Sequence, residues 1–312
     1  MKNEPPLISI IMATYNRAHL IEETLRSIAV QSYQNWECLI IDDGSKDETR
    51  EVVETFGNED SRFQYFKRSS SHKKGLPGSR NHGLTLAKGE YLVFFDDDDI
   101  PHPDCLKWSL EEILNYKADY CRFLRSVFFQ EINKDFNRFQ DYEVTLYNPL
   151  EVEKMITGKI PFNSCQVLWK ANCFENEIFN EELMFAEEWE MYTRLLLKKP
   201  KGISIEKYLY FGRKHPNSNT GEFHRREPVR LNSQIKAILL VIDNLSSKDL
   251  FNEKLKVYFL QMGFEFNSLA VIRKSLDASK SNVLIKLKYQ IGYHLYPILK
   301  PIFYLKGKIS KS

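Results

Sequence analysis

The residues best suited to chemistry are four consecutive aspartates at 96–99, which end an apolar run at 91–95. Adjacent carboxylates repel one another unless a cation or hydrogen-bond donors offset their charge. Mg²⁺ and Mn²⁺ prefer oxygen ligands, commonly take one or two carboxylates, and complete their coordination with water and phosphate oxygens. The run therefore indicates a divalent-metal site with a nucleotide diphosphate as co-ligand. The alternative is a solvated acidic turn in which Asp99 or Asp104 caps a helix.

Polar residues also follow two other apolar runs, at 7–12 and 38–41. Tyr15 and Asn16 follow the first run, and Asp43 follows the second. An aromatic ring can stack on a base, and a carboxylate can accept a hydrogen bond from a ring N–H. Together these residues suit a uridine pocket, although each one alone is an ordinary loop residue.

A glycine-rich stretch adds a cation to these groups. Glycines in it are expected to make the segment flexible, and its arginine is suited to approach a phosphate. The residues concerned are Gly75, Gly78, Arg80, Asn81 and Gly83. The phosphate-binding glycine patterns of P-loop and dinucleotide-binding folds are absent from the sequence.

The elements that must position these residues alternate along the chain. Strands are predicted at 7–12, 38–41, 63–66 and 91–95, and helices at 20–28, from 47 onward, and at 79–87. Such alternation predicts an α/β fold with a mainly parallel sheet and helices on both faces. Ligands of such sheets lie at the carboxyl ends of the strands, so Tyr15, Asp43 and the aspartates at 96–99 should converge.

The pattern becomes less regular after residue 104, with strands predicted at 120–129, 166–169 and 208–213 and a helix at 187–198. We interpret 1–222 as one domain made of two halves, 1–104 and 105–222. The chain from 223 to 312 has a helical pattern and forms a separate C-terminal region. Five apolar residues of this region fall on one predicted stripe: Leu255, Phe259, Met262, Phe266 and Leu269.

Composition narrows the class of protein. The formal net charge is +2, with 43% hydrophobic and 28% charged residues, which is typical of a folded soluble protein and argues against nucleic acid as a partner. The five cysteines are widely spaced and include no C-x-x-C pair, so we expect free thiols in a reducing cytoplasm. The sequence shows neither a secretion signal nor an apolar stretch of roughly 20 residues.

The chain after Asp277 contains seven lysines and no acidic residue. Aromatic residues are interleaved with these lysines: Tyr289, Tyr293, Tyr296, Phe303 and Tyr304. Basic and aromatic residues together suggest a peripheral contact with a membrane surface. The alternative is a solvated helical cap whose aromatic residues pack on the main domain.

Four motifs occur in order within residues 9–99: SIIMATYNR at 9–17, IDDGS at 41–45, GSRNHG at 78–83 and KGEYLVFFDDDD at 88–99. Together they resemble the family 2 glycosyltransferases of the GT-A fold. The resemblance implies transfer of a sugar from a nucleoside-diphosphate sugar, with a UDP-sugar as the expected donor, to an acceptor hydroxyl with inversion of configuration. It also implies Mn²⁺ or Mg²⁺ as cofactor and a role in bacterial surface-polysaccharide synthesis.

The resemblance also assigns roles to residues of the nucleotide-sugar-binding half, 1–104. It implies that Ala13, Tyr15 and Asp43 line the uracil and ribose, with Asn16 beside Tyr15 in the nucleotide-sugar pocket, and that Arg80 lies near the nucleotide.

Asp96 and Asp98 would form the D-x-D motif of the family. In this motif Asp98 would bind the metal, while Asp96 or Asp97 would face the ribose.

Residues 179–190 resemble the motif that supplies the family's general base. By position that base is Glu188, with Glu187 as the second candidate, whereas the family usually has aspartate there. Neighbouring apolar residues favour partial burial, which would raise a carboxyl pKa towards a useful range. His215 resembles a late family histidine near the metal and diphosphate; the alternative is an exposed loop histidine.

The acceptor half, 105–222, would bind a glycan or a lipid-linked glycan at the inner face of the cytoplasmic membrane. Two other classes stay open. The glutamate at 188 leaves room for a transferase-like protein that binds a nucleotide or polysaccharide without turnover. Paired carboxylates also occur in glycoside hydrolases. The sequence identifies neither the sugar nor the acceptor.

Overall fold

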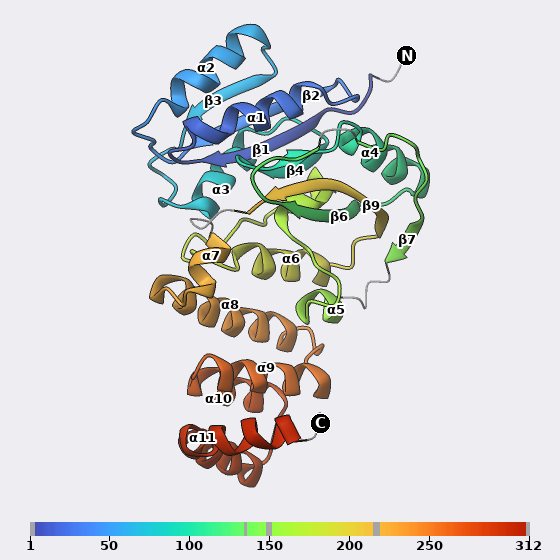
Figure 1. Ribbon diagram of the computed structural model, residues 1–312. Coiled ribbons are helices and arrows are strands. Elements are labelled where there is room, and N and C mark those ends of the chain that lie inside the picture. The colour runs from blue at the N-terminus through green and yellow to red at the C-terminus, as the bar shows by residue number, and fades with distance from the viewer. Residues whose placement is uncertain (1–3, 134–135, 148–151, 215–218, 310–312) are drawn as a thin grey trace. The chain divides into compact units, whose positions relative to one another are not determined.

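The computed structural model describes residues 4–133, 136–147, 152–214 and 219–309 (Figure 1). The chain divides into two compact units, Met1–Arg230 and Leu231–Ser312. The first unit is an α/β fold built on one sheet, and the second is helical.

Nine strands of the described residues form the sheet, in the order β3-β2-β1-β4-β8-β6-β9-β5, and β7 pairs with β9. Their bounds are β1 (Ile8–Thr14), β2 (Trp36–Asp42), β3 (Phe63–Lys67), β4 (Tyr91–Asp96), β5 (Ile100–Pro101), β6 (Tyr120–Phe128), β7 (Val144–Tyr147), β8 (Val167–Lys170) and β9 (Gly202–Arg213). Strands β3, β2, β1 and β4 are parallel, whereas β8 runs antiparallel to both β4 and β6. The mainly parallel sheet predicted from the first hundred residues is confirmed.

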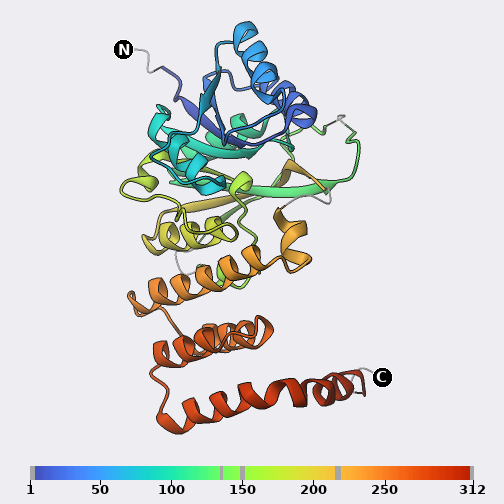
Figure 2. The ribbon, with the colours of Figure 1, turned by 90° about the vertical axis from the view of Figure 1, so that its left-hand side faces the viewer.

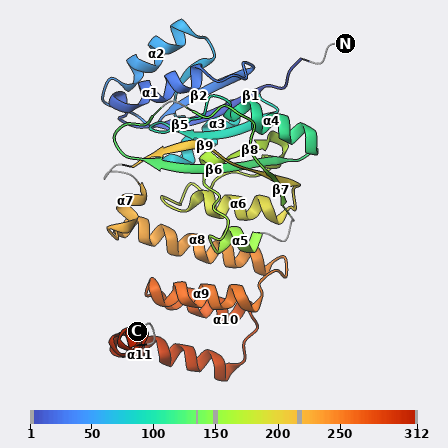
Figure 3. The ribbon, with the colours of Figure 1, turned by 45° about the vertical axis from the view of Figure 1, so that its right-hand side comes forward.

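Helices cover both faces of the parallel strands. The helices of this unit are α1 (Ala18–Ala29), α2 (Thr49–Glu59), α3 (Leu76–Leu86), α4 (Cys105–Tyr116), α5 (Val152–Ile156), α6 (Glu187–Leu197) and α7 (Asn219–His224), with short 3₁₀ turns η2 (Ser164–Gln166) and η3 (Ala171–Phe174). Figures 1 and 3 show α1 and α2 on one side of β1 and β2, and α3 and α6 on the other.

Strand β1 shows why both faces need a cover. Every residue from Ile8 to Met12 is buried, which is expected of a parallel strand between two layers. Ile10 belongs to the core that contains Ile21 and Leu25 of α1. Ile11 points to the opposite face.

Helix α3 differs from the sequence-based expectation. It begins at Leu76 rather than at 79, directly after Gly75, whose φ of +126° is open to glycine but strained for other residues. Pro77 lies in the first turn, where a missing N–H costs nothing. The prediction of a flexible segment is wrong for Gly78 and Gly83, because both lie inside this buried helix.

The second unit contains most of α8 (Pro228–Ser246), followed by α9 (Glu253–Glu265), α10 (Leu269–Ala278) and α11 (Val283–Ile309). The predicted apolar stripe at 255–269 is interrupted, because α9 ends at Glu265. Ser268 then caps α10 by accepting a hydrogen bond from the Val271 N–H. Leu255 and Phe259 of the stripe are buried.

The five cysteines carry no disulfide; four are buried and Cys173 is half-buried. The prediction of free thiols is confirmed. None of the described helices is long and apolar enough to cross a membrane.

Candidate active site

The carboxyl ends of β1, β2 and β4 lie side by side, so the predicted residues converge at one edge of the sheet. In the register of these strands Thr14 pairs with Asp42, and Ala13 pairs with Asp96. The Asp43 N–H donates to the Thr14 carbonyl at 2.9 Å. Ala13, Asp43 and the acidic turn therefore lie close together, although the sequence places them far apart.

Two adjacent aspartates at the end of β2 have different surroundings. Asp42 is buried and accepts hydrogen bonds from the Gly44 and Ser45 N–H groups and from the Tyr65 hydroxyl. This carboxylate holds the turn together.

The carboxylate of Asp43 instead contacts the segment before α3. Its two oxygens accept hydrogen bonds from Arg68 Nε and from the Gly75 N–H, the latter at 2.9 Å. The segment from Arg68 to Gly75 is thus fastened to the predicted nucleoside-binding aspartate.

Tyr15 and Asn16, both expected to line the nucleoside, differ in their contacts. The Tyr15 side chain is 41% exposed, and Lys74 Nζ lies 4.5 Å from its ring centroid. Asn16 has φ +53° and ties two loops together: its N–H donates to Ser45 Oγ, and its Oδ1 accepts from the Lys46 N–H, both at 2.8 Å. Tyr15 is therefore available for stacking, whereas Asn16 shapes the loop.

The acidic turn after β4 is surrounded by arginines. Asp96 lies 3.2 Å from Arg80 and Asp97 lies 3.3 Å from Arg17. These two arginines come from α3 and from the loop after β1.

The buried Asp99 is held from the other half of the sheet. Its carboxylate lies 3.2 Å from Arg125 Nη2 of β6 and accepts a hydrogen bond from the Arg213 N–H at 2.7 Å. The Arg213 side chain donates to the Asp98 carbonyl at 3.0 Å. The ends of β6 and β9 therefore fix the backbone of the turn.

The arginines do not fully offset the negative charge of the turn. Burial, with the Asp98 carboxylate beside it, raises the pKa of Asp97 to about 7. Burial and the Asp96 carboxylate raise the pKa of Asp99 well above its usual range. A carboxylate that resists ionisation inside a protein gains most from an added cation.

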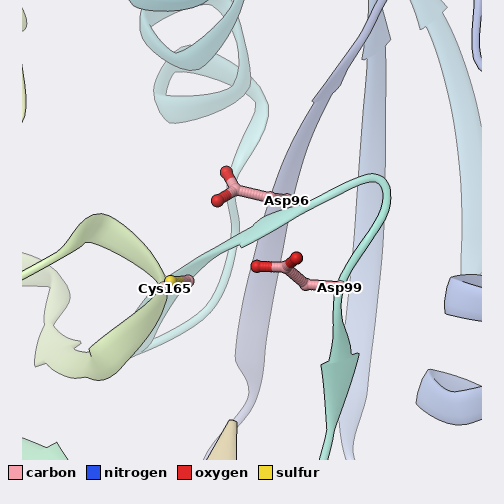
Figure 4. A group of neighbouring side chains, drawn as sticks. All are labelled: Asp96, Asp99 and Cys165. Atoms are coloured by element: carbon pink, nitrogen blue, oxygen red, sulfur yellow. The ribbon is translucent and has the colours of Figure 1, made fainter. Parts of the chain in front are cut away.

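The acidic turn and its neighbours offer several side chains that could bind a divalent metal ion. Among the residues that the structure describes, Asp96, Asp99 and Cys165 are a group of three potential ligands, with ligand atoms within 4.8 Å of one another. Figure 4 shows both carboxyl groups on the same side of the turn, towards Cys165. Burial raises the pKa of the Cys165 thiol well above its usual range, so it stays protonated and suits a hard ion poorly.

Carboxylates remain as the donors that fit Mg²⁺ or Mn²⁺. Asp96 and Asp98 are both only partly buried, so their oxygens are accessible, and the raised pKa values around them favour a cation. The oxygen donors of the acidic turn thus fit a hard divalent ion. Of the predicted ligands, Asp96 belongs to the group of three, Asp98 does not, and His215 lies outside the described residues, so the ligand set stays a prediction.

Arg80 links the acidic turn to the predicted base. Its side chain is 3% exposed, lies 3.1 Å from Glu187 and 3.8 Å from Glu188, and donates to Ser164 Oγ at 2.8 Å. With Asp96, three carboxylates surround one buried guanidinium. Arg80 thus binds the carboxylates of the site itself.

The two candidate bases at the start of α6 differ in burial. Glu187 has a side chain that is 8% exposed, and burial raises its pKa to about 7 although Arg80 opposes the rise. The Glu188 side chain is 26% exposed and accepts a hydrogen bond from the Ser164 N–H at 3.0 Å. Glu188 is therefore the more accessible carboxylate, and Glu187 is the partner of Arg80.

No role was predicted from the sequence for Arg17, Arg125, Arg213 or Ser164, which all contact the site. Arg17 stands in the first quoted motif but received no role. Arg122 and Arg125 both lie in β6, and a charged residue in a largely buried strand needs a partner. The buried Arg122 donates to the Pro161 carbonyl and to Ser204 Oγ, whereas the partly buried Arg125 lies 3.2 Å from Asp99 of the acidic turn.

The sheet, the acidic turn and the order of the motifs define a glycosyltransferase of the GT-A type. The chain belongs to glycosyl transferase family 2, whose family model matches residues 9–170. The protein is therefore a glycosyltransferase, and neither the glycoside hydrolase nor the non-catalytic binding protein considered from the sequence. The match includes the acidic turn and ends before Glu187 and Glu188.

Two curated relatives are named for transfer to lipid-linked sugars. The GalNAc(5)-diNAcBac-PP-undecaprenol β-1,3-glucosyltransferase of Campylobacter jejuni is 27% identical over 195 residues, covering 62% of this chain and 61% of the relative. The UDP-Glc:α-D-GlcNAc-diphosphoundecaprenol β-1,3-glucosyltransferase WfgD of Escherichia coli is 43% identical over 114 residues, covering 36% and 44%. The chain spans less than two thirds of each.

Solved structures share the fold at low identity. The S. aureus protein TarS, residues 1–349, in complex with UDP-GlcNAc has a TM-score of 0.58 and 18% identity, with 91% of this chain and 92% of that chain covered. The mannosyltransferase PcManGT of Pyrobaculum calidifontis, in complex with GDP-Man and Mn²⁺, has a TM-score of 0.57 and 16% identity, with 94% and 81% covered.

Proposed function

We propose that the protein transfers a sugar from a UDP-sugar to an acceptor hydroxyl, with inversion at the anomeric carbon and with a divalent metal ion as cofactor. The observation that carries the proposal is the position of Arg80, which joins the acidic turn to Glu187 and Glu188. Donor-binding and base-supplying groups are thus neighbours. A relative named for UDP-glucose and a neighbour bound to UDP-GlcNAc support UDP as the nucleotide.

Residues 1–104 form the donor-binding half of this proposal. Tyr15 offers an exposed ring for stacking on uracil, and Asp43 offers carboxylate oxygens to the nucleoside. Ala13, next to Asp96 in the sheet, leaves room for the nucleotide because its side chain is small.

Asp98 and Asp96 would hold the metal ion, with His215 as a further candidate ligand, and Asp97 would lie near the ribose. Bound there, the ion would act as a Lewis acid that stabilises the charge on the leaving diphosphate. Arg80 keeps its guanidinium between Asp96 and Glu187 and fixes the orientation of these two carboxylates.

Glu188 is the proposed general base. Its carboxylate takes the proton from the acceptor hydroxyl, the hydroxyl oxygen bonds to the anomeric carbon, and the bond from that carbon to the diphosphate oxygen breaks with its electron pair leaving on UDP. Attack from the face opposite the leaving group inverts the configuration. The hydrogen bond from the Ser164 N–H holds the carboxylate in position.

The acceptor proposed for the half at 105–222 is a lipid-linked glycan of a surface polysaccharide. Two relatives are named for diphosphoundecaprenol-linked acceptors. Such an acceptor places the enzyme in the cytoplasm, at the inner face of the cytoplasmic membrane, with a peripheral contact through the C-terminal tail.

The test is a panel of UDP-sugars in which UDP release is measured with and without Mn²⁺ or Mg²⁺. We expect metal-dependent release with one sugar, and a loss of about 10²–10⁴ in rate for Glu188→Gln, the usual contribution of a general base. Glu175→Gln, an exposed glutamate outside the site, is the matched control. UDP release from no member of the panel would overturn the donor, and equal rates for the two variants would overturn the base.

A further inference from the structure

Helix α11, the long helix nearest the C-terminus in Figure 2, exposes a row of aliphatic side chains in the second unit. The residues on it are between 45% and 79% exposed: Val283, Leu284, Leu287, Ile291 and Leu295. At 100° per residue, the last four fall on one narrow stripe along the helix axis. A row of large exposed aliphatic side chains on one helix marks an interaction surface.

The tyrosines of the same helix face inward instead. Tyr289 and Tyr293 pack against the core of α9 and α10, and the ring of Tyr296 lies 5.0 Å from the ring of Phe264. The Tyr293 hydroxyl donates to the Asn267 carbonyl at 2.9 Å. The expectation that these aromatic residues would meet either a membrane or the main domain is wrong for the described tyrosines, which hold α11 on its own unit.

The described charged side chains on α11 itself are basic, and one of them, Lys286, pairs with Asp277 at 2.6 Å. Lys288 is exposed at its border, and Lys280 is exposed just before the helix. Residues 278–312 contain seven lysines and no acidic residue. A second copy of the chain seated on this face would bring like charges together, whereas an anionic surface would neutralise them.

We propose that the α11 stripe, defined as Leu284, Leu287, Ile291 and Leu295, docks the protein on an anionic lipid surface. The helix lies in the plane of the interface, with the stripe among the acyl chains and with Lys280 and Lys288 at the headgroups. This inference rests on the proposed function, because it specifies the membrane contact proposed there. Its test requires neither a sugar donor nor an acceptor.

The experiment is co-sedimentation of the full chain with phosphatidylcholine vesicles that contain or lack phosphatidylglycerol. We expect binding only to the anionic vesicles, weakened by added salt because the lysine contribution is screened. The double variant Leu287→Glu/Ile291→Glu should bind at least about tenfold more weakly, because two inserted aliphatic side chains are replaced by charges. Val257→Glu, an equally exposed aliphatic residue of α9, is the matched control and should bind as the wild type does.

Three outcomes overturn the proposal: no binding to anionic vesicles, equal binding by the double variant, or equal loss by Val257→Glu. The mass of the wild type and the double variant in solution is measured in parallel. If the wild type is an oligomer, the double variant is a monomer, and the wild type does not bind vesicles, the stripe is instead a contact surface for a second copy of the chain. UDP release by the double variant is measured as well, to separate the two proposals. If only the docking proposal is wrong, UDP release is unaffected; if only the proposed donor is wrong, binding to vesicles is unaffected.

Discussion

Arg80 and Glu187 form a buried ion pair with 3.1 Å between guanidinium nitrogen and carboxylate oxygen, and their side chains are 3% and 8% exposed. The same guanidinium lies 3.2 Å from Asp96. One side chain of α3 therefore supplies a countercharge both to Asp96 of the acidic turn and to the start of α6. Removal of Arg80 should have a different consequence from removal of Glu187. Arg80 is one cation shared by several carboxylates, whereas Glu187 is one of those carboxylates.

Arg80→Met should destabilise the protein by about 3–5 kcal/mol, because it leaves buried carboxylates without their countercharge. Urea unfolding at neutral pH measures this change. Arg50→Met is the matched control: its side chain is 63% exposed and pairs with Glu54 on the surface of α2, so it should unfold close to the wild type. Similar midpoints for both variants would show that Arg80 is not the countercharge of the site.

Glu187→Gln should change how stability depends on pH. Burial raises the folded-state pKa of Glu187 from 4.5 to about 7. Between these values the folded state keeps a proton that the unfolded state releases, so this group stabilises the fold below about pH 4.5 and loses that contribution as pH rises through 7. The Gln variant has no titrating carboxyl group at this position, so its stability does not change with pH for this reason.

Unfolding free energies of the two proteins, measured with a chelator from pH 5 to pH 8, test this prediction. They should be similar near pH 5, and the Gln variant should gain stability relative to the wild type between pH 5 and about pH 7, after which the difference stays constant. A relative gain by the wild type at high pH would mean that the attraction of Arg80 outweighs the cost of burial. The pKa of Glu187 would then lie below 4.5.

The parallel half of the fold was predictable because its strands are covered on both faces, which leaves uninterrupted apolar runs in the sequence. The polar groups after β1, β2 and β4 could be placed together for the same reason, since parallel strands end at one edge. Side-chain partners were not predictable. Whether Asn16 shapes a loop or lines a ligand depends on Ser45 and Lys46, which lie about thirty residues away.

Glu181 is a positioning residue that links the donor and base segments. Its carboxylate accepts from Asn81 Nδ2 at 2.8 Å and from the Lys73 N–H at 2.7 Å, and lies 2.7 Å from His72 Nδ1. Burial alone would raise its pKa, but the hydrogen bonds from Asn81 and Lys73 lower it. Residues 68–75, which hold Asp43, are thereby fastened to residues 179–188.

Glu181→Gln keeps an acceptor but loses the charge, and hydrogen bonds to a charged group are worth about 1.5–3 kcal/mol. We expect a KM for the donor that rises about tenfold and a kcat that falls, because both segments are loosened. Steady-state kinetics with a varied donor measures the split. Glu182→Gln is the control, since Glu182 pairs with Lys73 on the exposed side of the same loop.

A purely structural role for Glu181 predicts another pattern. The melting temperature would fall while KM and kcat of the remaining folded enzyme matched those of Glu182→Gln. That result would contradict the coupling of the two segments. Rescue by Glu181→Asp in the donor KM, with the charge restored on a shorter side chain, would support it.

Glycines were the least predictable part of the site, because a glycine-rich stretch suits either a flexible loop or close packing. The structure distinguishes a flexible loop from close packing by the atoms that an added Cβ would contact at each glycine. At Gly78 it would lie 1.9 Å from the Lys73 carbonyl oxygen, and at Gly83 it would lie 2.4 Å from Ile11 Cγ2. Both contacts are too short, so α3 approaches its neighbours as closely as it does only because side chains are missing.

Gly83→Ala should therefore destabilise the protein by about 1–3 kcal/mol through overpacking against Ile11, although alanine favours helix formation by about 1 kcal/mol. Gly292→Ala in α11 is the matched control, because nothing lies within 4 Å of the added Cβ, and it should stabilise its helix. Urea unfolding followed by circular dichroism measures both variants. A stabilising Gly83→Ala would mean that α3 has room to move away from β1, and that the position of Arg80 does not depend on the close approach.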